Sequence, residues 1–124
     1  MARIGDLVAA VLPEVGVDVG YLEMTAPPAG VVLDRMVAAG RKRVVVQPLV
    51  LFGAGHAKSD VPAVVADGRQ RHRDVDLVFG SPLGVARGLV EILGDAVRAA
   101  GGTELPLLLI ARGTSDPDAN GDAH

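Results

Sequence analysis

Residues 44–62 read VVVQPLVLFGAGHAKSDVP, and this stretch indicates the fold. Residues 44–52 are almost continuously hydrophobic, which is typical of a strand buried on both faces of a parallel sheet. Gly53, Ala54 and Gly55 then allow a tight turn that leaves His56 just beyond the carboxyl end of the strand. Ligands of open α/β sheets bind at that edge. His56 is therefore the first candidate functional residue. The alternative is a histidine without a functional role, whose hydrogen bonds are satisfied within a loop.

Helical and extended patterns alternate along the rest of the chain. Helices are predicted over 4–12, 25–40, 62–68 and 85–100, and strands over 17–24, 44–52, 75–79 and 105–111. Thr25 is expected to cap the second helix, with Pro27 and Pro28 in its first turn. Pro48 does not fit a central strand because it has no N–H to donate, so we expect a bulge or an edge contact there. The alternation predicts right-handed crossovers and a parallel sheet with helices on both faces.

Composition limits the class of protein. A chain of 124 residues, 49% hydrophobic and 2% aromatic, suits one α/β domain over 1–124, with a polar tail over about 112–124. The net charge of −3 gives no electrostatic reason to expect nucleic acid. Cysteine is absent, so any metal must be held by histidine, carboxylates, other oxygen donors or the ligand itself. No apolar stretch approaches the roughly 20 residues that span a bilayer, and the N-terminus lacks a signal-peptide pattern, so we expect a cytoplasmic protein.

Four segments carry a resemblance to a known family. They read YLEMTAPP (21–28), VVVQPLVLFGAGHAKSDVPAVVADGRQRH (44–72), FGSPLG (79–84) and LLLIARGTSDPDAN (107–120). The chain resembles the sirohydrochlorin chelatases, class II enzymes that insert cobalt, iron or nickel into a tetrapyrrole during cobalamin or siroheme biosynthesis. The resemblance implies a flavodoxin-like domain, a tetrapyrrole substrate and a divalent metal as the second substrate, with no permanently bound cofactor. It also implies that short members form homodimers and long members carry two domains in tandem.

The order of the segments departs from the family. Its domains open with a strand and a loop, whereas here the matching piece, LLLIARGTSDPDAN, comes last. The chain therefore looks like a truncated or circularly permuted half of a chelatase. We expect the final strand to lie between those at 17–24 and 44–52, which restores the flavodoxin-like order. It can do so within its own chain, giving a permuted monomer, or in a neighbour, giving a swapped dimer.

The resemblance also implies roles for particular residues. Neutral imidazole binds cobalt, iron and nickel and accepts protons near neutrality, which makes His56 the candidate metal ligand or proton acceptor. Glu23 matches a metal-binding glutamate of the family; the alternative is a carboxylate favoured by a helix N-terminus. Arg112 stands where the family has a third ligand, a histidine, and a guanidinium has no lone pair for a metal.

Other candidates concern the carboxylates of the tetrapyrrole. Arg112 can grip a carboxylate with two hydrogen bonds and Lys58 can act as a point charge, although each is equally well explained as a solvated surface residue. Gly113 and Thr114 belong to a small polar turn that could present backbone N–H groups to an anion. His72, at a charged helix end, is expected on the surface.

The sequence is compatible with three alternative functions. The first is a tetrapyrrole metallochelatase that uses His56 and Glu23, impaired in this chain by Arg112. The second is a non-catalytic chelatase half that serves as a flavodoxin-like scaffold and forms a swapped dimer. Nucleotide or flavin binding follows only from analogy of fold, and no dinucleotide fingerprint supports it.

Overall fold

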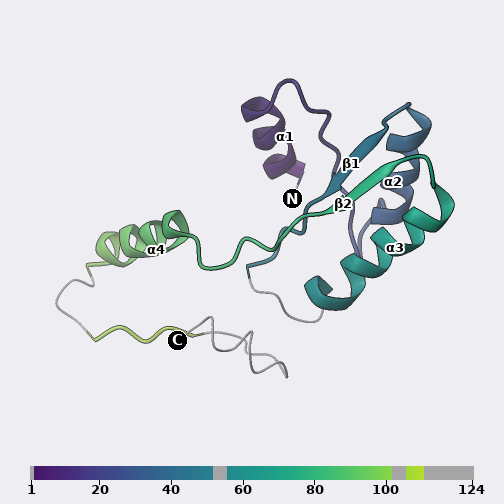
Figure 1. The fold of residues 1–124 in the computed structure, drawn as a ribbon. Helices are drawn as coiled ribbons and strands as arrows, with labels where there is room; N and C mark the ends of the chain where they lie inside the picture. The colour runs from purple at the N-terminus through teal and green to yellow at the C-terminus, as the bar shows by residue number, and fades with distance from the viewer. Residues whose placement is uncertain (1, 52–55, 102–105, 111–124) are drawn as a thin grey trace. The chain divides into compact units, whose positions relative to one another are not determined.

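The structure is a computed structural model that describes residues 2–51, 56–101 and 106–110. It contains the helices α1 (Ala2–Val11), α2 (Ala29–Ala38), α3 (Val61–Arg71) and α4 (Arg87–Ala99), the strands β1 (Arg43–Val46) and β2 (Asp76–Phe79), and the π-helix η1 (His56–Asp60) (Figure 1). The chain forms two compact units. Unit 1 comprises Met1–Val46 and Asp60–Gly80, and unit 2 comprises Gln47–Ser59 and Ser81–His124.

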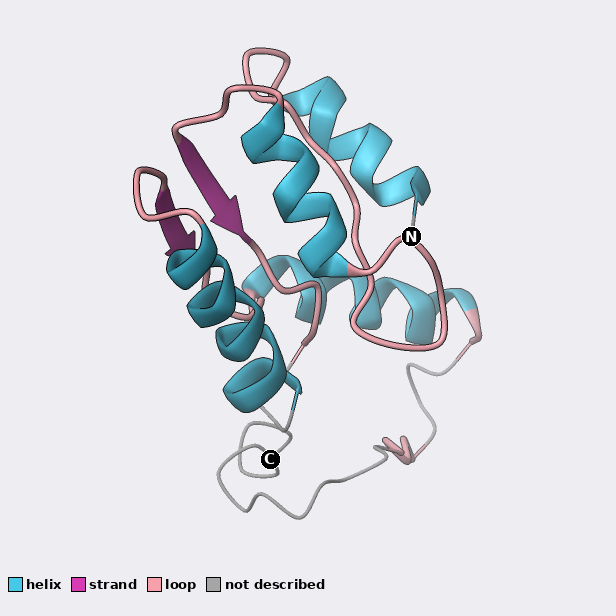
Figure 2. Cartoon of the chain, turned by 90° about the vertical axis from the view of Figure 1, so that its right-hand side faces the viewer, coloured by secondary structure: helices cyan, strands magenta, loops and turns pink. Residues whose placement is uncertain are grey.

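The sheet of unit 1 is parallel. β1 pairs with β2 in a register that runs from Arg43 opposite Asp76 to Val46 opposite Phe79. α3 packs on β2, and α2 packs on α3. Figure 2 shows the two strands as magenta arrows beside cyan helices. The predicted α/β fold with a parallel sheet is confirmed.

One hydrophobic cluster holds unit 1 together. Leu33 of α2, Val65 of α3, Val44 of β1 and Leu77 of β2 are each 5% exposed or less. Burying a valine or leucine side chain stabilises a fold by about 1.5–3 kcal/mol. These four residues therefore fix both helices on the same face of the sheet. Val45 alternates to the other face and remains 57% exposed.

The third helix is longer than predicted. The sequence places its end near Gly68, but α3 continues to Arg71. Gly68 is buried, and a Cβ atom there would overlap Cδ2 of Leu33 and lie 3.0 Å from Cδ1 of Leu77. This glycine therefore serves close packing in the middle of the helix rather than a helix end.

β1 is shorter than predicted. The hydrophobic run extends over 44–52, but the strand ends at Val46 and the buried Pro48 follows it. Because proline lacks the N–H that a ladder needs, the strand stops before it. In place of the bulge or edge contact expected within a longer strand, the strand ends before Pro48.

The strand predicted over 17–24 forms only one isolated bridge, between Tyr21 and Pro28. The second helix begins at Ala29 with Pro28 as its N-cap residue, so Thr25 does not cap it and the prolines precede its first turn. A strand needs a neighbour to pair with. Residues 106–110, the described part of the expected neighbour, belong to unit 2 and are assigned to no strand.

The final strand is also absent from the described part of its range. Residues 106–110 carry no strand, and the side chains over 107–110 are 58–87% exposed. The sheet that the structure describes has two strands, in the order β1-β2. Residues 106–110 belong to unit 2 and the sheet belongs to unit 1, so insertion of this segment within its own chain or into a second copy remains a prediction.

Candidate functional site

The segments that follow β1 and β2 stay joined in unit 2. The side-chain amide of Gln47 donates a hydrogen bond to the carbonyl oxygen of Ser81, with 2.5 Å between Nε2 and O. Backbone N–H groups of Leu83 and Gly84 donate to the carbonyls of Val50 and Leu51, at 3.1 and 2.8 Å. The pairing of these two segments thus continues beyond the strands, along the stretch that leads toward His56.

His56 is the first residue of η1, which runs directly into α3. The sequence predicts a loop here, with the helix starting near Pro62, so the histidine begins a helical segment instead of preceding one. The side chain of His56 lies outside what the structure describes. π-Helical turns are rare and occur frequently at functional sites. Lys58, in the same turn, has an exposed side chain.

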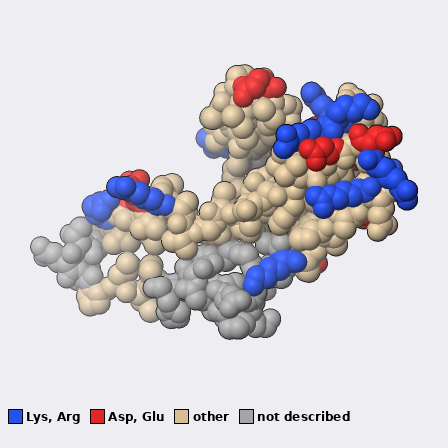
Figure 3. Space-filling model, viewed as in Figure 1, with Lys and Arg blue, Asp and Glu red and all other residues tan. Residues whose placement is uncertain are grey.

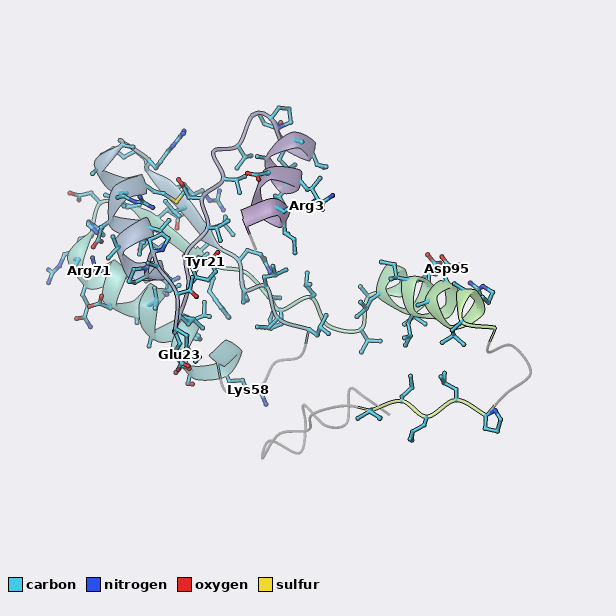
Figure 4. The ribbon with its side chains drawn as sticks, turned by 180° about the vertical axis from the view of Figure 1, so that it is seen from behind. Arg3, Tyr21, Glu23, Lys58, Arg71 and Asp95 are labelled. Atoms are coloured by element: carbon cyan, nitrogen blue, oxygen red, sulfur yellow. The ribbon has the colours of Figure 1, made fainter. Side chains whose placement is uncertain are left out.

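Glu23 lies on a closed loop between α1 and α2 rather than at the end of a strand. The backbone N–H of Tyr21 donates to the carbonyl of Pro27 at 2.9 Å, and that of Ala29 donates to the carbonyl of Tyr21 at 2.8 Å. Within this loop Met24 adopts a φ of 60°, which turns the chain directly after Glu23. Figure 4 labels Tyr21 and Glu23 on the segment that leads into α2. The carboxylate of Glu23 is exposed and belongs to unit 1.

The remaining predicted site residues lie outside the described part of the chain. Arg112, Gly113 and Thr114 fall within 111–124. Among residues whose side chains are described, no three histidine or carboxylate groups are placed to hold one metal ion. The structure therefore describes Glu23 and Lys58, each in its own unit, and leaves the assignment of a shared site as a prediction.

The sequence did not predict a charged cluster between α2 and α3. Nε2 of His72 lies 2.6 Å from Oδ1 of Asp34, and Arg71 pairs with the same carboxylate as well as with Asp67. The side chain of His72 is only 22% exposed, so the expected surface position is wrong in part. The hydrogen bonds from His72 and Arg71 hold the pKa of Asp34 below its ordinary value. Asp34 and His72 are 38 residues apart, and no local pattern links them.

Positively and negatively charged side chains are intermixed on the surface of unit 1. Figure 3 shows lysine and arginine side chains of unit 1 with aspartate and glutamate side chains among them. At the start of the sheet, Nε of Arg43 lies 3.1 Å from Oδ2 of Asp76. None of the helices in the described ranges has the length and hydropathy needed to cross a membrane.

Comparisons with known proteins identify relatives. A model of the CbiX family matches residues 1–100. A sirohydrochlorin cobaltochelatase from Priestia megaterium is 35% identical over 114 residues, covering 87% of this chain and 37% of that protein. A sirohydrochlorin ferrochelatase from the same organism is 30% identical over 108 residues, covering 85% of this chain and 41% of that protein.

Two solved structures are similar to this chain in fold and in sequence. SirB from Bacillus subtilis with Fe3+ superimposes with a TM-score of 0.76 at 28% identity, covering 98% of this chain and 52% of that one. SirB from Bacillus subtilis subspecies spizizenii in complex with cobalt gives a TM-score of 0.73 at 27% identity, covering 98% and 53%. The chain spans about two fifths of the length of these curated relatives and half of these solved chains. Because the family model covers most of the sequence, the resemblance is confirmed and the chain belongs to the CbiX family.

Proposed function

We propose that this chain is part of a chelatase that inserts a divalent metal ion, cobalt or iron, into sirohydrochlorin. The observation that carries the proposal is the CbiX match over residues 1–100, together with relatives named as sirohydrochlorin cobaltochelatase and ferrochelatase. Solved neighbours with Fe3+ and with cobalt support a transition metal as the second substrate.

Insertion of a metal ion sets two requirements for the residues of the site. A divalent ion that enters the macrocycle displaces two pyrrole N–H protons, so the site must hold the ion weakly and accept protons. We assign His56 as metal ligand and proton acceptor, because neutral imidazole does both. We assign Glu23 as the second ligand. Its exposed carboxylate, on a loop pinned by two backbone hydrogen bonds, supports this role.

The carboxylates of the tetrapyrrole substrate must be bound by cations and by N–H donors. We assign Lys58 and Arg112 to these carboxylates, with the turn at Gly113 and Thr114 as a donor of backbone N–H groups. The exposed position of Lys58, two residues after His56, supports its part in this assignment. Arg112 cannot serve as a third metal ligand, since its guanidinium stays protonated.

A second candidate function is a non-catalytic half of a chelatase that acts as a scaffold and forms homodimers. The residue at position 112 favours it. With Arg112 in place of the histidine that the family resemblance implies, two protein ligands remain for the metal.

Following the absorbance of sirohydrochlorin after addition of cobalt separates the two functions. For a chelatase we expect insertion faster than the spontaneous reaction, and we expect His56→Ala to abolish the acceleration while the matched histidine control His124→Ala retains it. Arg112→His supplies a second imidazole as the third metal ligand, so it should raise the rate. If neither the wild-type chain nor Arg112→His accelerates insertion, the scaffold is the function.

A further inference from the structure

The loop between α1 and α2 holds Met24 in a backbone conformation that a methionine disfavours. Its φ is 60°, and among the described residues no other residue apart from glycines has a positive φ. The left-handed region suits glycine and tolerates asparagine and aspartate, whereas a larger side chain brings Cβ too close to the following carbonyl oxygen. Residues held in this way persist only where the surrounding structure imposes the conformation, and they cluster at ligand-binding and catalytic sites.

The base of the loop imposes this conformation. The backbone N–H of Tyr21 donates to the carbonyl of Pro27, and the N–H of Ala29 donates to the carbonyl of Tyr21. Gly20 lies so close to the start of α2 that an added Cβ atom would be 2.7 Å from Cα of Ala29. All of these residues belong to unit 1. The conformation of Met24 is therefore set by contacts within unit 1 and does not depend on the position of unit 2.

The side chains at the tip of the loop are apolar on both sides of Glu23. Nothing in unit 1 covers Met24, whose side chain is 100% exposed, and Leu22 is 37% exposed. Single exposed apolar side chains are ordinary on protein surfaces and carry no functional meaning by themselves. Met24 differs because glycine or asparagine would satisfy the same turn at lower cost, so the turn alone does not explain a methionine directly after the candidate metal ligand.

We propose that Met24 contacts the face of the bound tetrapyrrole ring and so positions the ring beside the carboxylate of Glu23. The inference rests on the proposed function and adds a residue to the same site. The faces of a tetrapyrrole ring are apolar and conjugated, while its carboxylates lie on the rim. The thioether of methionine is polarisable and makes favourable contacts with conjugated rings.

The contact has two consequences for the site. It removes water from the neighbourhood of Glu23, which strengthens the attraction between this carboxylate and a metal ion. Because the base of the loop is fixed by hydrogen bonds before the substrate arrives, little conformational freedom is lost when the ring binds. Met24 thus acts as a positioning residue, and the proton transfers remain with the residues already assigned.

Binding of sirohydrochlorin to the whole chain in the absence of metal tests the proposal. Tetrapyrrole fluorescence reports the dissociation constant, which we expect to rise about tenfold in Met24→Gln, a change of about 1.4 kcal/mol. Met24→Leu keeps an apolar side chain of similar size, so it should rescue most of the affinity. Val11→Gln is the matched control, because Val11 is a 78% exposed apolar residue of α1 in the same unit, and it should bind as the wild type does. Unchanged binding by Met24→Gln overturns the proposal.

Urea unfolding of the same variants separates contact with the substrate from a structural role. An exposed side chain that waits for a ligand adds nothing to the stability of the free chain, so Met24→Gln should unfold at the same urea concentration as the wild type. A lower unfolding midpoint in Met24→Gln would show that Met24 packs against the rest of the chain, and it would overturn the proposal.

Chemical protection gives a direct readout of the contact. The chain has no native cysteine, so Met24→Cys introduces a single thiol. We expect iodoacetamide to alkylate this thiol rapidly in the free chain and several-fold more slowly at saturating sirohydrochlorin, whereas Val11→Cys should react at the same rate in both. A thiol at position 24 that reacts equally fast with and without bound sirohydrochlorin contradicts the contact.

The outcomes distinguish this inference from the proposed function. If the wild type binds sirohydrochlorin and inserts cobalt but Met24→Gln behaves in the same way, the inference fails and the chelatase stands. If the wild type binds sirohydrochlorin with the expected dependence on Met24 and inserts no metal, the inference stands and the chelatase fails. A wild-type chain that binds no sirohydrochlorin overturns both.

Discussion

Gly68 is the residue where α3 comes closest to its neighbours. The absence of a side chain lets Leu33 of α2 and Leu77 of β2 approach the helix from two directions. The sequence shows a glycine between polar residues and suggests a helix end, because glycine commonly ends helices. Only the packing of three elements shows that the residue must be small.

Gly68→Ala is expected to lower the free energy of unfolding by about 1–3 kcal/mol, because the added methyl group overpacks the core. Gly88→Ala is the control: it lies within α4 with nothing within 4 Å of the added atom, and helix propensity predicts a gain of about 0.5–1 kcal/mol. Urea unfolding followed by circular dichroism measures both. A Gly68→Ala variant as stable as the wild type contradicts this account of the core.

Gln47 joins two segments beyond the strand ends through one side-chain hydrogen bond to Ser81. A hydrogen bond of this kind contributes about 0.5–1.5 kcal/mol. Gln47→Ala should therefore speed hydrogen exchange at the nearby amides of Leu83 and Gly84 about fivefold, which corresponds to about 1 kcal/mol. Gln70→Ala, at an exposed position of α3, is the control and should leave both amides unchanged. Equal exchange in the two variants would show that Gln47 does not hold these segments together.

The helices α2 and α3 are joined by charge as well as by apolar packing. Asp34 of α2 accepts hydrogen bonds from His72 and Arg71 at the end of α3. Its carboxylate is 44% exposed, so solvent screens the interaction and limits its contribution to stability. The cluster fixes the ends of the two helices relative to each other while the hydrophobic core holds their middles.

Stability should depend on pH through this cluster. The pKa of Asp34 is lowered in the folded chain, so its contribution is present above the ordinary carboxyl pKa of about 4 and disappears as pH falls through the lowered value. Asp34→Asn should cost up to about 1 kcal/mol at pH 7, and the difference from the wild type should vanish toward pH 2. Unfolding curves at both pH values measure it, with Asp95→Asn in the exposed pair of α4 as the control. A difference that stays constant over this range would rule out Asp34 as its source.

Unit 1 and unit 2 differ in how much apolar surface they bury. All six buried hydrophobic residues of the described chain belong to unit 1: Val32, Leu33, Val44, Val61, Val65 and Leu77. The apolar residues of α4 and of 106–110 remain exposed or half-buried. Resistance to local unfolding follows buried apolar contacts, so the two units should not be equally stable.

Hydrogen exchange of the whole chain should show this difference. At low protein concentration we expect slow exchange in β1, β2 and α3, and fast exchange in α4 and 106–110. Equal protection of α3 and α4 would contradict this difference between the two units.

The residues of the candidate site come from the sequence alone. The run GHAKSDVP after an apolar strand makes His56 the first candidate, and the match to the CbiX family model confirms the family. The sequence did not show that His56 begins a π-helical turn or that Glu23 lies on a closed loop, because both depend on backbone hydrogen bonds formed during folding. Whether His56, Glu23 and Arg112 share a site remains a prediction.

Local patterns were enough to predict the four α-helices of the described residues, since helical periodicity and turn residues act within one segment of the chain. They also predicted a parallel α/β arrangement, whereas the family came from the resemblance of four segments of sequence. The lengths of the strands, the contact between Asp34 and His72, and the small space at Gly68 could not be read from those patterns. Each depends on segments distant in sequence, and a strand exists only where another strand supplies its hydrogen bonds. Among the described residues, 17–24 makes only the bridge from Tyr21 to Pro28 and 106–110 carries no strand, so the strands predicted over these ranges remain predictions.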